Sequence, residues 1–321
     1  MSAAVPVPLL VVGHGTRSAE GVDEFHRLVE RVRRRAGAPP VVEGGFIELA
    51  APPVRDAVSA VVEQAGRHLA VVPLVLAAAG HGKGDIPAAV AREQERHPGL
   101  TYRYGRPLGP HPALQDLLAA RVDTALGIDG LDEAARLAVR ADVHVVLVGR
   151  GSTDPDANAE VAKVARLLLE GRGWADVQPA FISLAAPGVP AALERAARLG
   201  ARRVVVAPYF LFPGVLPDRI LEQSEAFAAA HPEVEVRVAG LLGDCDELAD
   251  LVLERYREAL HGDIRMNCDT CAYRVALPGF VDKVGRPQTP HDHPDDPAHP
   301  HHHDHHHPHG HAHSPADAGA R

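Results

Sequence analysis

The sequence contains two similar halves, and this repeat constrains the fold more than any other feature. Residues 13–16 (GHGT) match residues 149–152 (GRGS) at an offset of 150 − 14 = 136. Residues 46–52 (FIELAAP) match residues 181–187 (FISLAAP) at an offset of 183 − 48 = 135. Chance would not preserve the spacing between motifs as well as the motifs, so the chain is predicted to be an internal duplication.

Each half alternates strand-like and helix-like segments. In the first half, short apolar runs rich in β-branched residues predict strands at 9–12, 41–49, 69–78 and from residue 102. Apolar residues at helical spacing predict helices at 23–35, 52–66, 85–97 and 112–126. This alternation predicts a parallel α/β sheet with helices on both faces and right-handed crossovers.

The domain organisation follows from the repeat and from a change of composition near the end. Residues 1–130 and 131–262 are predicted to form two similar domains, each a four-stranded parallel sheet flanked by helices. Residues 263–286 carry a Cys-x-x-Cys pair, and residues 287–321 form a His-rich tail that holds twelve of the chain's 21 histidines. The tail is expected to be disordered, because it has almost no apolar residue larger than alanine.

Three polar residues follow buried strands in the first half. His14 and His81 each sit in a glycine-flanked turn after an apolar run, and Glu48 lies at a third strand end. Carboxyl ends of parallel strands meet at one edge of a sheet, where ligands bind. Two imidazoles and a carboxylate suit a divalent metal that must be exchanged. The alternatives are a core histidine on each strand, and a buried Glu48 paired with an arginine.

The second half lacks these candidate ligands. His14 is replaced by Arg150 and Glu48 by Ser183, while the turn at 80–83 (GHGK) becomes 212–215 (FPGV). Only the first half is therefore expected to hold a metal. Arg150 and Ser183 either line the opposite wall of a cleft that receives a flat polycarboxylate molecule, or are remnants of a decayed site.

The motifs at 13–17 (GHGTR), 46–48 (FIE) and 80–87 (GHGKGDIP) resemble the class II tetrapyrrole chelatases, specifically the sirohydrochlorin chelatases. The resemblance spans nearly the whole chain, since long members of the cobalt-inserting branch also have a second similar domain, a Met-x-Cys-x-x-Cys segment and a His-rich tail. It implies two chelatase-like domains and a lyase-type enzyme that inserts a divalent metal, above all cobalt, into sirohydrochlorin for cobalamin biosynthesis.

The resemblance also implies roles for single residues. His14 and His81 are expected to bind the metal. Glu48 is expected to accept protons from the ring nitrogens, to act as a third ligand or to orient one of the histidines. The carboxylate side arms of sirohydrochlorin call for positive charge at the cleft rim. The residues expected to bind substrate are Arg17, Lys83, Arg150 and Ser183.

Cys268 and Cys271 have the spacing of half a zinc site, half an iron–sulfur site or a redox pair. In the family, the matching segment is associated with a 4Fe–4S cluster. Because one chain cannot supply four thiolates, such a cluster implies a homodimer in which each chain gives both cysteines. The remaining cysteine, Cys245, is expected to be a buried thiol.

Composition excludes several classes of protein. The net charge of −9 argues against a nucleic-acid partner, and no apolar stretch is long enough for a membrane span or a secretory signal. A cytoplasmic enzyme is expected. Iron insertion for sirohaem, with nickel as a further candidate metal, and a non-catalytic metal store or chaperone remain as alternatives. A dinucleotide site is disfavoured, because Ser18 stands where the fingerprint needs its third glycine.

Overall fold

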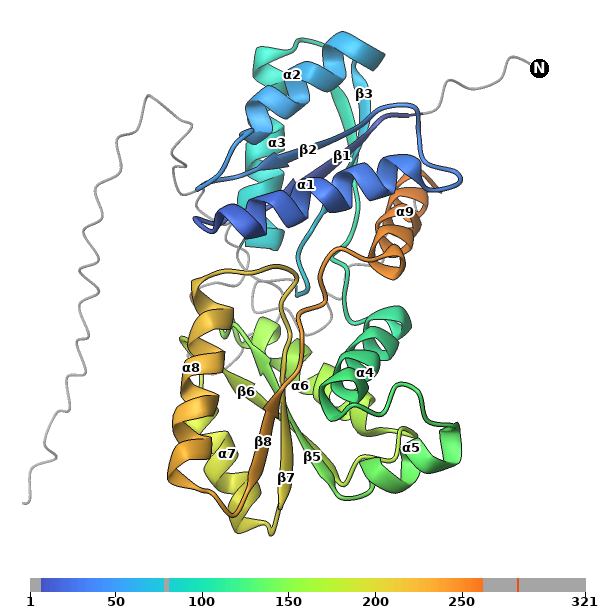
Figure 1. Cartoon of the computed structure of the whole chain (residues 1–321). Coiled ribbons are helices and arrows are strands. Elements are labelled where there is room, and N and C mark those ends of the chain that lie inside the picture. Colours follow the sequence, from blue (N-terminus) through green and yellow to red (C-terminus); the bar gives the residue numbers. More distant parts are fainter. Residues whose placement is uncertain (1–6, 78–80, 262–281, 283–321) are drawn as a thin grey trace, which may run out of the picture.

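The protein consists of two lobes, each built on a four-stranded parallel sheet (Figure 1). The computed structural model describes residues 7–77, 81–261 and 282. The first sheet has the order β2-β1-β3-β4 and the second the order β6-β5-β7-β8. The strands are β1 (Leu9–Gly13), β2 (Val42–Phe46), β3 (His68–Pro73), β4 (Thr101–Tyr104), β5 (Val143–Gly149), β6 (Asp176–Phe181), β7 (Arg203–Pro208) and β8 (Glu235–Val238). The predicted fold of two similar parallel α/β sheets is confirmed.

The helices cover both faces of the sheets. In α1, Phe25, Leu28 and Val32 are buried at helical spacing, and the Ser18 side chain caps the first turn by accepting from the amide of Gly21. Within the described residues, no helix is long and apolar enough to cross a membrane. The helices are α1 (Ala19–Arg34), α2 (Val54–Ala65), α3 (Ile86–Arg96), α4 (Pro112–Leu126), α5 (Glu133–Arg140), α6 (Pro155–Leu169), α7 (Val189–Arg198), α8 (Val215–Ala230) and α9 (Asp246–His261).

The two lobes exchange their last helices. Helix α4 follows the first sheet in sequence but packs against β7, β8 and α6 of the second lobe, whereas α9 returns to pack against β3 and α1 of the first (Figure 1). One hydrophobic core therefore runs through both lobes, with Leu9 and Leu118 in the same cluster as Val205 and Leu251. Residues 1–130, predicted as one domain, thus contribute a helix to the other lobe.

Two predicted strands are shorter than the apolar runs that predicted them. Residues 41–49 were expected to form one strand, but β2 ends at Phe46. Residues 69–78 were expected to form another, but β3 ends at Pro73, where the amide of Leu74 makes the last bond to β1 by donating to Val12 O. Because β1 itself ends at Gly13, an extended chain beyond Leu74 has no partner on that side. The turns that carry the predicted site are therefore longer than expected.

Candidate metal and substrate site

The carboxyl ends of the two sheets face each other across the junction between the lobes. At the start of α1, Gly21 packs against the carbonyl of Pro213, so closely that an added Cβ would lie 2.4 Å from that oxygen. After β3, Lys83 forms an ion pair with Asp154 at the start of α6. Each contact joins the end of a strand in one lobe to the first helix of the other, so the predicted site residues lie at the junction.

His14 and Glu48 meet at this junction. His14 directly follows β1, and Glu48 lies in the turn after β2, with Gly13 and Phe46 opposite each other in the sheet. His14 Nε2 is 3.2 Å from Glu48 Oε1, and the two side chains are 27% and 23% exposed. A carboxylate at this distance orients the imidazole and increases its basicity, while the partial exposure leaves the pair accessible to a metal ion.

The backbone of the two turns fixes the relative position of His14 and Glu48. The amide of Glu48 donates to His14 O at 3.1 Å. A Cβ on Gly15, which has φ of 107°, would lie 1.8 Å from Glu48 O, so only glycine permits this crossing. Leu49 next to it has φ of 64°, an unusual value for a side chain of this size. Such an over-determined turn is typical of a functional site.

The same turn is repeated in the second lobe around different side chains. The amide of Ser183 donates to Arg150 O at 3.0 Å, a Cβ on Gly151 would lie 1.8 Å from Ser183 O, and Leu184 has φ of 60°. Arg150 is exposed and Ser183 is half-buried. The structure therefore brings Arg150 and Ser183 together as the counterpart of the His14–Glu48 pair.

His81 opens a π-helical turn, η1 (His81–Asp85), that leads into α3. The structure describes the backbone of His81 and not its side chain, so its role as a second metal ligand stays a prediction. Among the described side chains, no three His, Cys, Asp or Glu residues converge as a metal site. The described part of the chain therefore supplies two of the three predicted ligands.

The remaining predicted residues differ in their surroundings. Arg17, in the turn before α1, is exposed as expected for a rim cation. Cys245 is a half-buried thiol whose pKa is raised by burial. The predictions for Cys268 and Cys271, and for the tail at 287–321, lie outside the described residues.

Lys83 is not the solvent-facing rim cation that the sequence suggested. Its side chain is only 10% exposed, and its ammonium group donates to Asp154 Oδ2 at 2.9 Å and to Asp156 Oδ2 at 3.0 Å. Sequence reasoning missed both aspartates. The repeat contained a signal for one of them, because Asp154 replaces Ser18 at an offset of 154 − 18 = 136.

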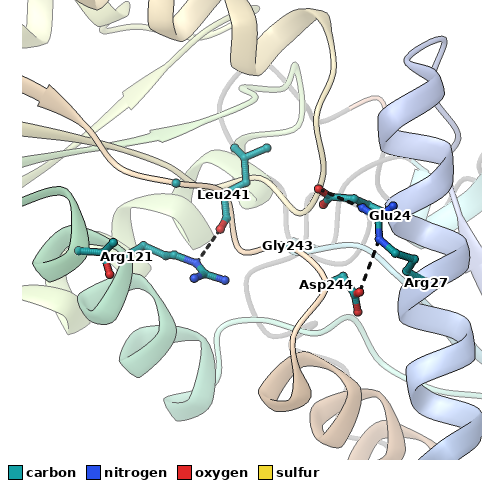
Figure 2. Close-up of a pocket in the computed structure, with 8 residues that line it drawn as sticks. Glu24, Arg27, Arg121, Leu241, Gly243 and Asp244 are labelled. Carbon is teal, nitrogen blue, oxygen red and sulfur yellow. Dashed lines mark hydrogen bonds and ion pairs between the residues drawn. The ribbon is translucent and has the colours of Figure 1, made fainter. Parts of the chain in front are cut away.

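A separate polar pocket of about 490 Å³ lies between α1, α4 and residues 240–244 (Figure 2). None of the predicted site residues lines it. Arg121 donates there to the carbonyl oxygens of Leu241 and Leu242 at 2.8 and 2.9 Å, and Arg27 lies 3.8 Å from Asp244. Both arginines are thus engaged with the segment 240–244, and among the described side chains no predicted metal ligand reaches this pocket.

The chain is similar in sequence and in fold to known sirohydrochlorin chelatases. The chain is 36% identical over 274 residues to a sirohydrochlorin cobaltochelatase of Priestia megaterium, covering 85% of this chain and 87% of that protein. It is 31% identical over 252 residues to a sirohydrochlorin ferrochelatase of the same organism, covering 78% and 90%. The sirohydrochlorin chelatase SirB from Bacillus subtilis subspecies spizizenii, solved in complex with cobalt, superimposes with a TM-score of 0.66 at 29% identity, covering 81% of this chain and 98% of SirB.

The family model CbiX matches the chain twice, at residues 8–125 and again at residues 144–259. The two matches fall on the two repeats that the sequence predicted, and the His14–Glu48 pair lies in the first of them. Because the two matches together span well over half of the sequence, the chain belongs to the CbiX family.

Proposed function

We propose that this chain inserts cobalt into sirohydrochlorin in cobalamin biosynthesis. The observation that carries the proposal is the His14–Glu48 pair, held 3.2 Å apart at the edge where the two sheets face each other. The Priestia megaterium cobaltochelatase, 36% identical over most of both chains, supports cobalt as the metal and sirohydrochlorin as the ring.

The metal is a substrate of this reaction, and the first lobe provides its ligands. Neutral imidazoles of His14 and His81 suit a first-row divalent ion and bind it weakly enough to release it to four ring nitrogens. Insertion also requires two pyrrole N–H protons to leave the ring. Glu48 accepts such a proton, or stays bound as a third ligand, and its contact with His14 keeps the imidazole oriented.

The second lobe is proposed to bind the polycarboxylate ring. Arg150 is exposed on the turn equivalent to that of His14, and Arg17 is exposed on the first lobe. Guanidinium groups pair well with carboxylates, and Ser183 adds a hydroxyl donor beside Arg150. The body of the chain carries these cations despite a net charge of −9, so electrostatic attraction of the ring depends on their location.

Iron is the second candidate metal. The Priestia megaterium ferrochelatase is 31% identical over most of both chains, and a His/His/Glu ligand set accommodates either metal. On this alternative the product is sirohaem.

The further parts of the proposal concern segments outside the described residues. Cys268 and Cys271 are proposed to give one thiolate each, so that two chains together supply the four thiolates of a shared 4Fe–4S cluster and the enzyme is a homodimer. No step of metal insertion is assigned to this cluster. The enzyme is proposed to act in the cytoplasm, where thiols remain reduced.

The test is metal insertion into sirohydrochlorin with cobalt, iron and nickel at equal free concentrations, followed by the absorption change of the ring. We expect cobalt to be inserted fastest, and His14→Ala and His81→Ala each to nearly abolish insertion while circular dichroism stays unchanged. His261→Ala removes an exposed histidine at the end of α9 and should have no effect. Turnover of both site variants near the wild-type rate would show that the metal site is misplaced.

A further inference from the structure

Lys83, Asp154 and Asp156 form a nearly buried ion triad between the lobes, here called the Lys83 triad. The exposed fractions of the three side chains are 10%, 12% and 11%. Burial lowers the pKa of Lys83, but the hydrogen bonds to Asp154 and Asp156 outweigh it and raise the pKa above its ordinary value. Two short charge-assisted hydrogen bonds in a nearly buried site thus link the lobes at Lys83.

The second lobe holds its side of the triad rigidly. Asp154 caps α6, since its Oδ1 accepts from the amide of Asp156 at 3.1 Å, and two carboxylates at a helix N-terminus are stabilised by the helix dipole. Ser152 and Asn158 lock the same turn with reciprocal hydrogen bonds of 2.9 and 2.7 Å. The turn at the start of α6 is held by its own hydrogen bonds, so it can hold the Lys83 ammonium group in a fixed position.

Lys83 lies outside the sheet, in the part of the first lobe that follows β3. β3 ends at Pro73, well before the π-helical turn His81–Asp85 in which Lys83 lies. The far end of that turn is fixed because Ile86 of α3 is fully buried. The near end carries His81, two residues before Lys83, and the Lys83 triad is the contact that ties this turn to the second lobe.

The repeat shows which members of the Lys83 triad differ between the two halves of the chain. The residue equivalent to Lys83 is Val215, at an offset of 215 − 83 = 132, and it is 65% exposed. The residue equivalent to Asp154 is Ser18, and the residue equivalent to Asp156 is Glu20, at an offset of 156 − 20 = 136. The reciprocal contact, in which Gly21 packs on the carbonyl of Pro213, is a close approach of backbone atoms. Lys83 and Asp154 therefore have no charged counterparts in the repeat, whereas Asp156 corresponds to the acidic Glu20.

We propose that Lys83 is a positioning residue, which Asp154 and Asp156 of the second lobe hold in place so that the turn His81–Asp85 presents His81 to the metal. This inference rests on the proposed function and replaces a direct contact between Lys83 and the substrate. It also gives the second lobe, which lacks metal ligands of its own, a part in forming the metal site.

The experiment compares Lys83→Met with Asp154→Asn/Asp156→Asn in the full chain. Asparagine preserves the cap of α6 while it removes the charge. Both variants should lower kcat for cobalt insertion by about 10- to 100-fold, the usual effect of losing a group that orients a metal ligand, with KM for sirohydrochlorin within about twofold of wild type. Lys83→Arg should restore part of kcat. Lys163→Met, which removes an exposed lysine of α6, is the matched control and should change nothing.

Two further measurements separate positioning from other roles. Amide hydrogen exchange of a peptide spanning residues 81–96 should be faster in both triad variants, whereas the rest of the chain exchanges normally. Combining all three substitutions should cost no more than Lys83→Met alone, because the residues act as one unit. Melting temperatures and circular dichroism identify a variant that has lost its fold. If Lys83→Met is unfolded, the same rates and exchange are measured for Lys83→Arg instead.

The contrary outcomes are distinct. A raised KM with unchanged kcat would make Lys83 a substrate contact, and unchanged kcat and KM with faster exchange would leave the triad a purely structural link; either result overturns the proposal. If the wild-type chain inserts no metal, the proposed function fails. The Lys83 triad is then tested by cobalt binding. The affinity for cobalt that is lost in His14→Ala should also fall about tenfold or more in Lys83→Met.

Discussion

At the scale of single residues, the His14–Glu48 pair gains its geometry from backbone rather than from side-chain packing. The bond from the Glu48 amide to His14 O and the close approach of Gly15 place the two side chains before any metal binds. Because the same turn recurs with Arg150 and Ser183, the scaffold tolerates different side chains at these two positions. Both lobes thus share one turn, and the side chains at its two positions determine what this edge of each sheet can bind.

Arg150→Ala tests the role of the second member of this repeated turn. Arg150 is proposed to bind a substrate carboxylate in the ground state and in the transition state alike, so its loss should raise KM for sirohydrochlorin by about twofold to tenfold with kcat nearly unchanged. Steady-state rates of cobalt insertion measure both constants.

The control for Arg150→Ala is Arg34→Ala, which removes a guanidinium that is 71% exposed at the far end of α1. It should leave both constants unchanged. A lower kcat at constant KM for Arg150→Ala would instead place Arg150 in the chemical step, contrary to the proposal.

The sequence predicted that His14 and Glu48 lie at the same edge of the sheet, but it did not predict the surroundings of Lys83. Strand ends and glycine turns are local patterns, and parallel strands bring their ends together, so His14 and Glu48 were predictable. The partners of Lys83 come from the other lobe, and only the relative orientation of the two sheets brings them within 3.0 Å. A glycine-rich turn with a lysine suggests an exposed cation until that orientation is known.

At the scale of elements, the exchanged helix α9 is fixed by a buried arginine. Arg255 is fully buried and donates to Pro107 O at 3.0 Å, to Leu108 O at 2.9 Å and to Glu258 Oε1 at 2.9 Å. Arg106 from the first lobe donates to the same carboxylate at 2.6 and 2.8 Å. Glu258 thus neutralises a buried cation and joins α9 to the segment that follows β4.

Glu258→Gln should destabilise the protein in a pH-dependent way. The hydrogen bond from Arg106 lowers the pKa of Glu258 below its ordinary value of 4.5, and Arg255 adds to the effect. A carboxyl with a lowered folded-state pKa stabilises the fold fully above its unfolded pKa, and this stabilisation is lost as the pH falls through the folded value. We expect a loss of about 1–2 kcal/mol at pH 7, measured by urea unfolding, that disappears in acid well below pH 4.5.

The matched variant is Glu133→Gln, whose partner Arg136 lies on the surface of α5 with side chains 65% and 31% exposed. Exposed pairs contribute little, so this change should be nearly neutral at both pH values. A difference between Glu258→Gln and wild type that persisted in strong acid would show that the carboxylate charge is not the cause.

Local pattern predicted the elements of the first lobe, but not which sheet each helix covers. Helical spacing over 112–126 matches α4 at both ends, because capping and periodicity are encoded within the segment. Contacts between residues far apart in the sequence decide which sheet α4 and α9 pack against, because both sheets offer an apolar face to an amphipathic helix. The longer strands predicted at 41–49 and 69–78 failed for a related reason, since apolar character continues after the neighbouring strand has ended.

At the scale of the whole molecule, the body and the tail differ in what they bring to the reaction. The body places its candidate metal ligands in the first lobe and its candidate anion-binding groups on both lobes, which are joined by exchanged helices. The sequence beyond Val284 has no apolar residue larger than alanine apart from proline, and it carries twelve histidines. We therefore expect the tail to act on metal supply and not on the fold or on the chemical step.

Truncation after Val284 separates these roles. The melting temperature and the rate at saturating cobalt should stay nearly unchanged, because a segment without a packing surface contributes neither core nor catalytic group. At scarce cobalt the truncated chain should be slower, since twelve imidazoles hold weakly bound metal close to the site and raise its effective concentration. That advantage should fade below about pH 6, where histidines take up protons instead of metal.

The measurement is the insertion rate against free cobalt for the full-length and truncated chains, at neutral and at mildly acidic pH. Replacing the twelve tail histidines by asparagine in the full-length chain provides the control for tail length, and it should reproduce the truncation. Superimposable curves at every cobalt level would remove the delivery role and leave storage, or no role, for the tail. Loss of activity even at saturating cobalt would instead make the tail part of the catalytic machinery, because bulk metal then no longer substitutes for it.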